Sequence, residues 1–113
     1  MEMRYKIWLE KDGEAVFGNG LESLLETIDE AGSINRASAA LHMSYREAWG
    51  RIKEAEDRLG FKLLERQIGG EEGGGAKLTD PARDLLKRYE DLRAEVDREM
   101  ERIYRNHFGD PSI

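Results

Sequence analysis

The sequence lacks cysteine entirely, and its 113 residues include only two prolines and two histidines. The absence of cysteine excludes disulfides, thiolate catalysis and cysteine-ligated zinc. The two histidines, His42 and His107, share no metal-ligand spacing, so we expect neither a metal nor a cofactor. No nucleophile stands in a recognisable pattern with a general base, and we therefore predict that the protein is not an enzyme.

Long hydrophobic runs are also missing. No stretch approaches the roughly 18 apolar residues of a membrane span, and residues 1–6 are not followed by the apolar core of a secretory signal. These absences predict a cytoplasmic protein without a membrane partner. The length suits a single domain, residues 1–113, built around one hydrophobic core.

Charge is unevenly distributed along the chain. The net charge of -6 at first argues against a nucleic-acid partner. However, residues 1–32 hold eight acidic and three basic side chains, whereas residues 33–68 hold five acidic and seven basic ones. The surplus of positive charge in the central segment is small, but it allows one face of the protein to meet phosphates while the rest stays acidic.

Residues 4–17 have the pattern of a β-hairpin. Apolar and polar residues alternate up to Glu10, which is typical of a strand with one buried face. Asp12-Gly13 then supplies a tight turn, and residues 15–17 return as the second strand.

Asn19 predicts the start of the first helix. Glu22 follows it at the spacing of a capping box, in which two side chains satisfy the free amides of a helix start. Leucines and an isoleucine then recur at helical spacing, and Gly32 ends the helix.

Residues 33–59 indicate a helix-turn-helix. Ser33 caps a short helix, in which the small side chains of Ala37 and Ser38 allow a second helix to approach closely. Ser44 caps that second helix. In this motif the second helix enters the major groove of DNA, whose width admits one helix.

A second hairpin and a long helix complete the chain. Residues 61–78 are expected to form the hairpin, with a glycine-rich tip at residues 69–75 that lacks the Gly-Lys-Ser/Thr ending of a phosphate-binding loop. Thr79 and Pro81 open a helix over residues 80–106. The predicted fold is mainly α with small β-hairpins: a winged helix-turn-helix with a long C-terminal dimerisation helix.

The predicted partner is double-stranded DNA. Arg46 can bind a guanine edge or a phosphate, and Gly50 permits close approach of the backbone. Tyr45 and Trp49 are about as consistent with packing as with DNA contact. The full set of predicted DNA-binding residues is Asn35, Arg36, Ser44, Tyr45, Arg46, Trp49, Gly50, Lys53 and Lys77.

The last helix carries a narrow apolar stripe on a heavily charged surface. Its spacing is close to that of a coiled-coil seam, which predicts a homodimer. The alternative is that its first half packs on its own domain and its end is solvated. The predicted dimerisation residues are Leu85, Tyr89, Leu92, Val96 and Ile103.

Several short motifs resemble those of a known family. They are Gly32-Ser33-Ile34, Ser44-Tyr45-Arg46-Glu47-Ala48-Trp49, Leu64-Glu65-Arg66, the glycine-rich tip and Leu78-Thr79. Together they resemble the DNA-binding domain of ModE-type, molybdate-responsive regulators and, more distantly, that of LysR-type regulators. The resemblance implies a winged-helix fold, a homodimer and a palindromic operator.

Two features depart from the ModE pattern. The molybdate-binding modules that follow this domain in the family are missing from the 113 residues, so direct oxyanion sensing is not expected. Glu71 and Glu72 stand in the wing where the family commonly has a basic residue. They motivate an alternative function: a protein-interaction module on a winged-helix fold that has lost DNA binding.

Overall fold

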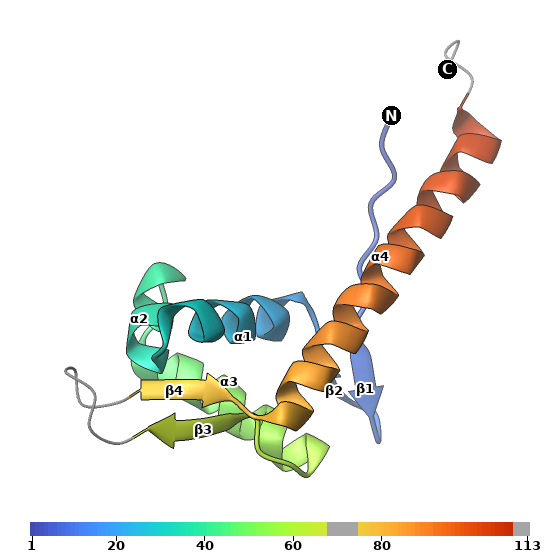
Figure 1. Ribbon diagram of the computed structural model, residues 1–113. Helices are drawn as coiled ribbons and strands as arrows, with labels where there is room; N and C mark the ends of the chain where they lie inside the picture. The colour runs from blue at the N-terminus through green and yellow to red at the C-terminus, as the bar shows by residue number, and fades with distance from the viewer. Residues whose placement is uncertain (68–74, 110–113) are drawn as a thin grey trace.

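The computed structural model describes residues 1–67 and 75–109 (Figure 1). The first hairpin consists of β1 (Leu9–Lys11) and β2 (Glu14–Phe17). Three helices follow: α1 (Asn19–Ala31), α2 (Ile34–Ala40) and α3 (Tyr45–Leu59). The second hairpin consists of β3 (Leu64–Gln67) and β4 (Gly75–Leu78), and α4 (Asp80–Phe108) comes last. This order confirms the predicted fold class.

Most element boundaries follow the local signals that predicted them. Ser33, Ser44 and Thr79 accept hydrogen bonds from the backbone amide three residues later, at 3.0 to 3.2 Å. Gly32 and Gly60 end α1 and α3 with φ of 79° and 87°. This left-handed conformation is easy for glycine because it has no Cβ.

The first hairpin is shorter than predicted. Asp12 and Gly13 both have positive φ, and Lys11 pairs with Glu14, so the two-residue turn is as expected. The strand predicted over residues 4–10, however, begins only at Leu9. The chain turns into α1 directly after β2, and residues 4–8 are left without a partner strand.

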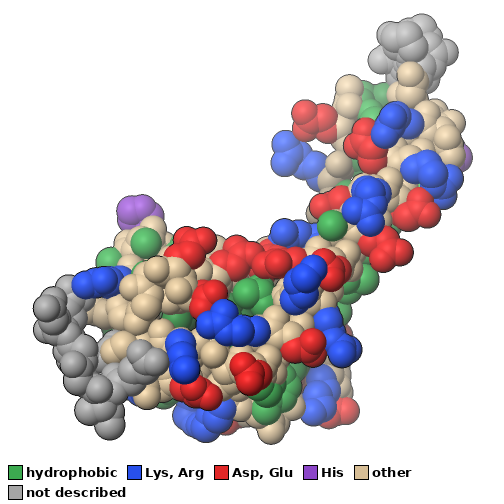
Figure 2. Space-filling model, viewed as in Figure 1, with side chains coloured by type: hydrophobic (Ala, Val, Ile, Leu, Met, Phe, Trp, Pro, Cys, Tyr) green, Lys and Arg blue, Asp and Glu red, His purple; other side chains and the backbone are tan. Residues whose placement is uncertain are grey.

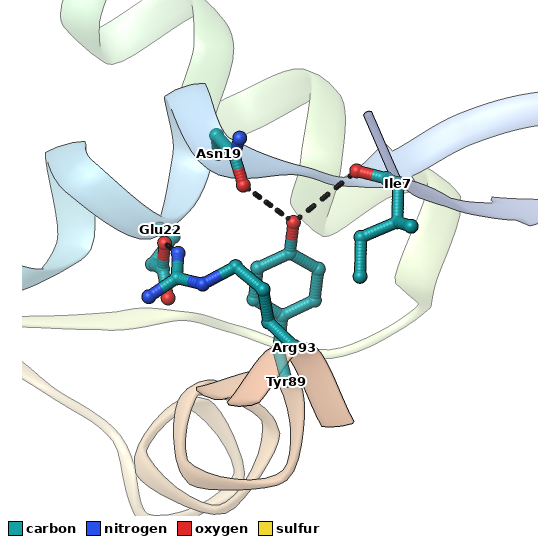
Figure 3. Close-up of polar contacts among 5 residues, drawn as sticks. All are labelled: Ile7, Asn19, Glu22, Tyr89 and Arg93. Carbon is teal, nitrogen blue, oxygen red and sulfur yellow. Dashed lines mark hydrogen bonds and ion pairs between the residues drawn. The ribbon is translucent and has the colours of Figure 1, made fainter. Parts of the chain in front are cut away.

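The start of α1 also differs from the prediction. Gly18, not Asn19, is the N-cap, and no side chain caps this end of the helix. Asn19 Oδ1 instead accepts a hydrogen bond from the Tyr89 hydroxyl at 2.7 Å, and Glu22 forms an ion pair with Arg93 (Figure 3). Both expected capping groups are therefore used by α4, which lies 70 residues further along the chain.

The hydrophobic core lies where α1, α2, α3, the second hairpin and the start of α4 meet. Buried residues recur at helical spacing on α1 and α3, and the two strands of the second hairpin contribute Leu64, Ala76 and Leu78. The Ala76 amide donates to the Gly32 carbonyl at 2.8 Å. The Thr79 hydroxyl donates to the Lys62 carbonyl at 2.7 Å. These bonds fix the second hairpin against the helices.

Helix α4 makes the protein elongated. Its first turns pack on the core, and the rest projects away from the domain beside the N-terminal segment (Figure 1). The radius of gyration is 17.3 Å, against about 13 Å for a compact chain of this length. The Tyr104 hydroxyl donates to the Met1 carbonyl at 2.6 Å, and the Tyr5 hydroxyl bonds Asp97. The N-terminal segment is therefore held by hydrogen bonds to the projecting part of α4 and not by strand pairing with β2.

Candidate nucleic-acid interface

Helix α2 and the turn after it hold α3 in place. Ala37 and Ser38 are buried, which lets α2 lie close to its neighbours. The Met43 amide donates to the Ser38 carbonyl at 2.9 Å, and Leu41 and Met43 pack against the core as predicted. His42 has a φ of 56°, a conformation that is uncommon outside glycine. The break was predicted here, but the left-handed residue that makes the sharp turn was not.

One flank of α3 presents two cations on either side of a glycine. Arg46, Gly50 and Lys53 are all exposed, and their spacing places them on the same face of the helix. Within residues 1–67 and 75–109, neither Arg46 nor Lys53 has an ion-pair partner. A Cβ atom at Gly50 would meet no atom within 4 Å, so this flank is open to a large ligand.

The opposite flank of α3 is electrically compensated. Arg51 pairs with Glu47 at 3.0 Å. Arg58 pairs with Glu14 at 3.0 Å and with Glu54 at 2.5 Å. The unpaired positive charge of α3 in the described structure therefore lies on the flank of Arg46 and Lys53. Arg58 also ties α3 to β2, because it pairs with Glu14 and donates to the Ala15 carbonyl.

A contact that the sequence did not predict joins β3 to α3. The Arg66 guanidinium lies over the Trp49 ring, 4.4 Å from its centre, and donates a hydrogen bond to the Tyr45 hydroxyl at 2.7 Å. Trp49 also packs partly against the core. Tyr45 and Trp49 thus serve in packing, while the exposed Tyr45 ring remains at the surface beside Arg46. Arg66 stood in the Leu64-Glu65-Arg66 motif, but nothing in that motif indicated its partner.

The remaining predicted DNA-binding residues are arranged around α3. Asn35 and Arg36 are exposed in the first turn of α2. Ser44 is exposed at the start of α3, where its hydroxyl is engaged as the cap. Lys77 lies across from Glu65 in the second hairpin and pairs with it at 3.7 Å, so its charge is partly offset. The predicted wing tip, including Glu71 and Glu72, lies outside the described residues.

The predicted dimer seam on α4 divides into two parts. Tyr89 is only 1% exposed, its ring lies 4.7 Å from that of Phe17, and its hydroxyl bonds Asn19. Its assignment to the seam was wrong, because the first turns of α4 are used to close the core of their own domain. Leu85 is partly buried there too. Leu92 and Ile103 are 41% and 40% exposed, and Val96 between them is half-buried.

Residues 22–83 match the family model described as bacterial regulatory helix-turn-helix protein, lysR family. The chain belongs to this family. The matched residues run from α1 to the first turn of α4, so they include both helices of the predicted motif and the second hairpin.

Relatives with known names support the resemblance to ModE. The chain is 38% identical over 80 residues to the molybdenum transport protein ModE of Azotobacter vinelandii, covering 71% of this chain and 30% of the relative. It is 39% identical over 74 residues to the DNA-binding transcriptional dual regulator ModE of Escherichia coli K12, covering 66% and 28%. The chain therefore spans less than a third of the length of these relatives.

The fold is similar to that of a protein solved in complex with DNA. A crystal structure of the CbnR_DBD–DNA complex superimposes with a TM-score of 0.56 and 25% identity, covering 72% of this chain and 87% of that chain. In the described residues, no helix is both long enough and apolar enough to cross a membrane.

Proposed function

We propose that this chain is a sequence-specific DNA-binding regulator of transcription that binds a palindromic operator as a homodimer. The main support for DNA binding is the flank of α3 formed by Arg46, Gly50 and Lys53. Its cations have no ion-pair partner in the described structure, although acidic side chains outnumber basic ones in the whole chain. Phosphates of DNA supply the missing negative charge.

The same flank carries the specificity in this proposal. Arg46 lies in the first turn of α3, the part of a recognition helix that contacts base edges in the major groove. Its guanidinium can donate two hydrogen bonds to a guanine. Asn35 and Arg36 lie at the start of α2 and are placed to contact the DNA backbone. As a DNA-binding protein the chain would act in the cytoplasm, and it needs no catalytic residue.

The homodimer is proposed from the outer half of α4. Leu92, Val96 and Ile103 form an apolar stripe on the part of the helix that projects from the domain. Two such helices packed together would bury the stripe and present two recognition helices related by a twofold axis. A twofold protein binds a palindromic site with matching half-site spacing.

Selection from a random pool of double-stranded DNA, followed by fluorescence anisotropy, tests the proposal. We expect enrichment of a palindrome and an affinity that falls steeply with salt, because phosphate contacts release counterions. Arg46→Ala should weaken binding roughly 10- to 100-fold, since one bidentate base contact contributes about 1–3 kcal/mol. Lys53→Ala should reduce the slope of log affinity against log salt by about 1.

Arg88→Ala is the matched control. It removes the same charge from an exposed site on α4 that pairs only with Asp84 in the described structure. Its affinity for the selected DNA should equal that of the wild type. Equal losses in Arg88→Ala and Arg46→Ala, or no selected sequence at low salt, would contradict the proposal and favour a protein-interaction module.

A further inference from the structure

Three carboxylates from two helices converge where α4 leaves the domain. Glu22 and Glu26 lie one turn apart on α1, and Glu90 lies on α4. One carboxylate oxygen of each lies within 4.8 Å of the other two. Figure 2 shows acidic side chains gathered on the face of the domain that carries α1.

Glu22 supplies the unusual feature of this group. The residue is 4% exposed, and its Oε1 atom pairs with Arg93 (Figure 3). Its Oε2 atom is buried and has no hydrogen-bond partner in the described structure. A buried carboxylate oxygen without a donor is strongly unfavourable, because burial removes its water and nothing replaces it. The position needs a donor or a cation that the residues of the described structure do not provide.

Glu26 and Glu90 also lie close together without a cation between them in the described structure. Their carboxyl groups are hydrogen-bonded to each other, and this bond, together with burial, raises the pKa of Glu26. Arg93 is the one cation paired with the cluster in the described residues. When all three carboxylates are ionised, two negative charges remain uncompensated.

We propose that Glu22, Glu26 and Glu90 form a binding site for a hard divalent cation that fastens α1 to α4. Carboxylate oxygens are the ligands that Ca²⁺ and Mg²⁺ use in proteins. Two oxygens on opposite sides of Ca²⁺ are about 4.6–5.2 Å apart, and around Mg²⁺ about 4.0–4.2 Å. The three oxygens all lie within 4.8 Å of one another, so one ion of the size of Ca²⁺ can reach all three carboxylates.

The three ligands were not recognisable in the sequence. The expectation of no metal site rested on the spacing of histidine and the absence of cysteine. Glu90 is 64 residues beyond Glu26 and reaches it only because α4 packs on α1. If the proposed function holds, the cation would also fix the direction of α4 and with it the distance between the two recognition helices of a dimer.

Metal binding to the full chain, stripped with a chelator and free of DNA, tests the site independently of DNA binding. Titration calorimetry with Ca²⁺ should show one site per chain and weaker binding of Mg²⁺. Tb³⁺ should give luminescence sensitised by the neighbouring Tyr89, and Ca²⁺ should displace it. Absence of Ca²⁺ binding at millimolar concentrations would overturn the proposal.

Amide variants separate this site from ordinary surface binding. Glu26→Gln and Glu90→Gln keep the side-chain shape and remove one ligand charge, so each should weaken Ca²⁺ binding at least tenfold. Glu95→Gln makes the same change at an exposed position of α4 and should bind as the wild type does. Equal affinity in all three variants would contradict the proposal. Paramagnetic Mn²⁺ locates the site in the wild-type protein, so this test does not depend on whether a variant folds. The broadening of NMR signals should centre on residues around Glu26, and broadening centred elsewhere would equally overturn the proposed site.

Discussion

The Arg66 guanidinium lies over the Trp49 ring, 4.4 Å from its centre, and so joins the second hairpin to the exposed side of α3. The same guanidinium donates to the Tyr45 hydroxyl. One side chain thereby contacts two residues in the first half of α3. The orientation of α3 relative to the hairpin depends on this contact as well as on the core beneath it.

Arg66→Ala should destabilise the protein by about 1–2 kcal/mol. The change removes a cation–π contact of about 0.5–1 kcal/mol and a hydrogen bond of similar size. Denaturant unfolding measures the effect. A double-mutant cycle with Trp49→Leu should show coupling between the two positions. Arg88→Ala, which breaks only an exposed ion pair with Asp84, should cost little. Additive effects of Arg66→Ala and Trp49→Leu would refute the contact.

Tyr89→Phe should destabilise the protein by about 0.5–1.5 kcal/mol, because it removes the hydrogen bond that the Tyr89 hydroxyl donates to Asn19 Oδ1. The Tyr89 hydroxyl also lies 3.3 Å from the Ile7 carbonyl, so faster hydrogen exchange is expected at the start of β1. Tyr104→Phe is the control at the exposed end of α4 and should have a smaller effect. An unchanged free energy of unfolding in Tyr89→Phe would show that the bond is not formed in solution.

Stability should fall as the pH rises above about 10. The hydrogen bond to Asp97 raises the pKa of Tyr5, and burial raises the pKa of Tyr89, with the Asp97 charge adding to it. Unfolded tyrosine loses its proton near pH 10. The folded state holds these protons longer, so its advantage is complete below pH 10 and is lost as the pH passes the raised values.

Absorbance at 295 nm measures the tyrosine titration directly. In Asp97→Asn the acceptor remains but the negative charge is gone, so the titration should move down toward pH 10. The Tyr5→Phe variant should lose one of the late-titrating groups. If all four tyrosines titrate together at their ordinary pKa, the N-terminal segment does not lie along α4 as described.

Gly50→Ala should separate stability from DNA binding. Glycine weakens a helix interior by about 0.5–1 kcal/mol relative to alanine, and here a Cβ meets no atom within 4 Å. The free energy of unfolding should therefore rise by about that amount. The affinity for DNA should fall, because the added methyl group lies between Arg46 and Lys53 on the proposed interface. Unchanged affinity would show that DNA does not approach this part of α3.

Replacing Leu92 and Ile103 together by glutamate should convert the proposed dimer into a monomer. Both side chains are exposed on the projecting part of α4, so the domain should keep its fold. Light scattering after size-exclusion chromatography gives the mass, and circular dichroism checks the helix content. Ala94→Glu changes an exposed position on the opposite side of the helix and should leave the dimer intact. A wild-type monomer at micromolar concentrations would refute the proposed dimer.

The candidate interface was partly predictable, because its backbone is set by local signals. Ser44 identified the start of α3, and the helical period then placed Arg46, Gly50 and Lys53 on one face. The period could not show which arginines of α3 would be neutralised. Arg58 forms an ion pair with Glu14, which lies 44 residues away on β2, whereas Arg46 has no ion-pair partner in the described structure. That difference is why only the flank of Arg46 and Lys53 is the candidate DNA-binding site.

The sequence by itself determined the elements and their order. Caps, the Asp12-Gly13 turn, the stop glycines and the apolar period act over a few residues, so they can be read without a fold. Tertiary structure decided what those elements do to one another. The packing of α4 on α1 buries Tyr89, takes Asn19 and Glu22 away from the helix start and brings Glu90 to Glu26. Such contacts join residues about 70 apart, and their energies depend on burial that exists only after the chain has folded.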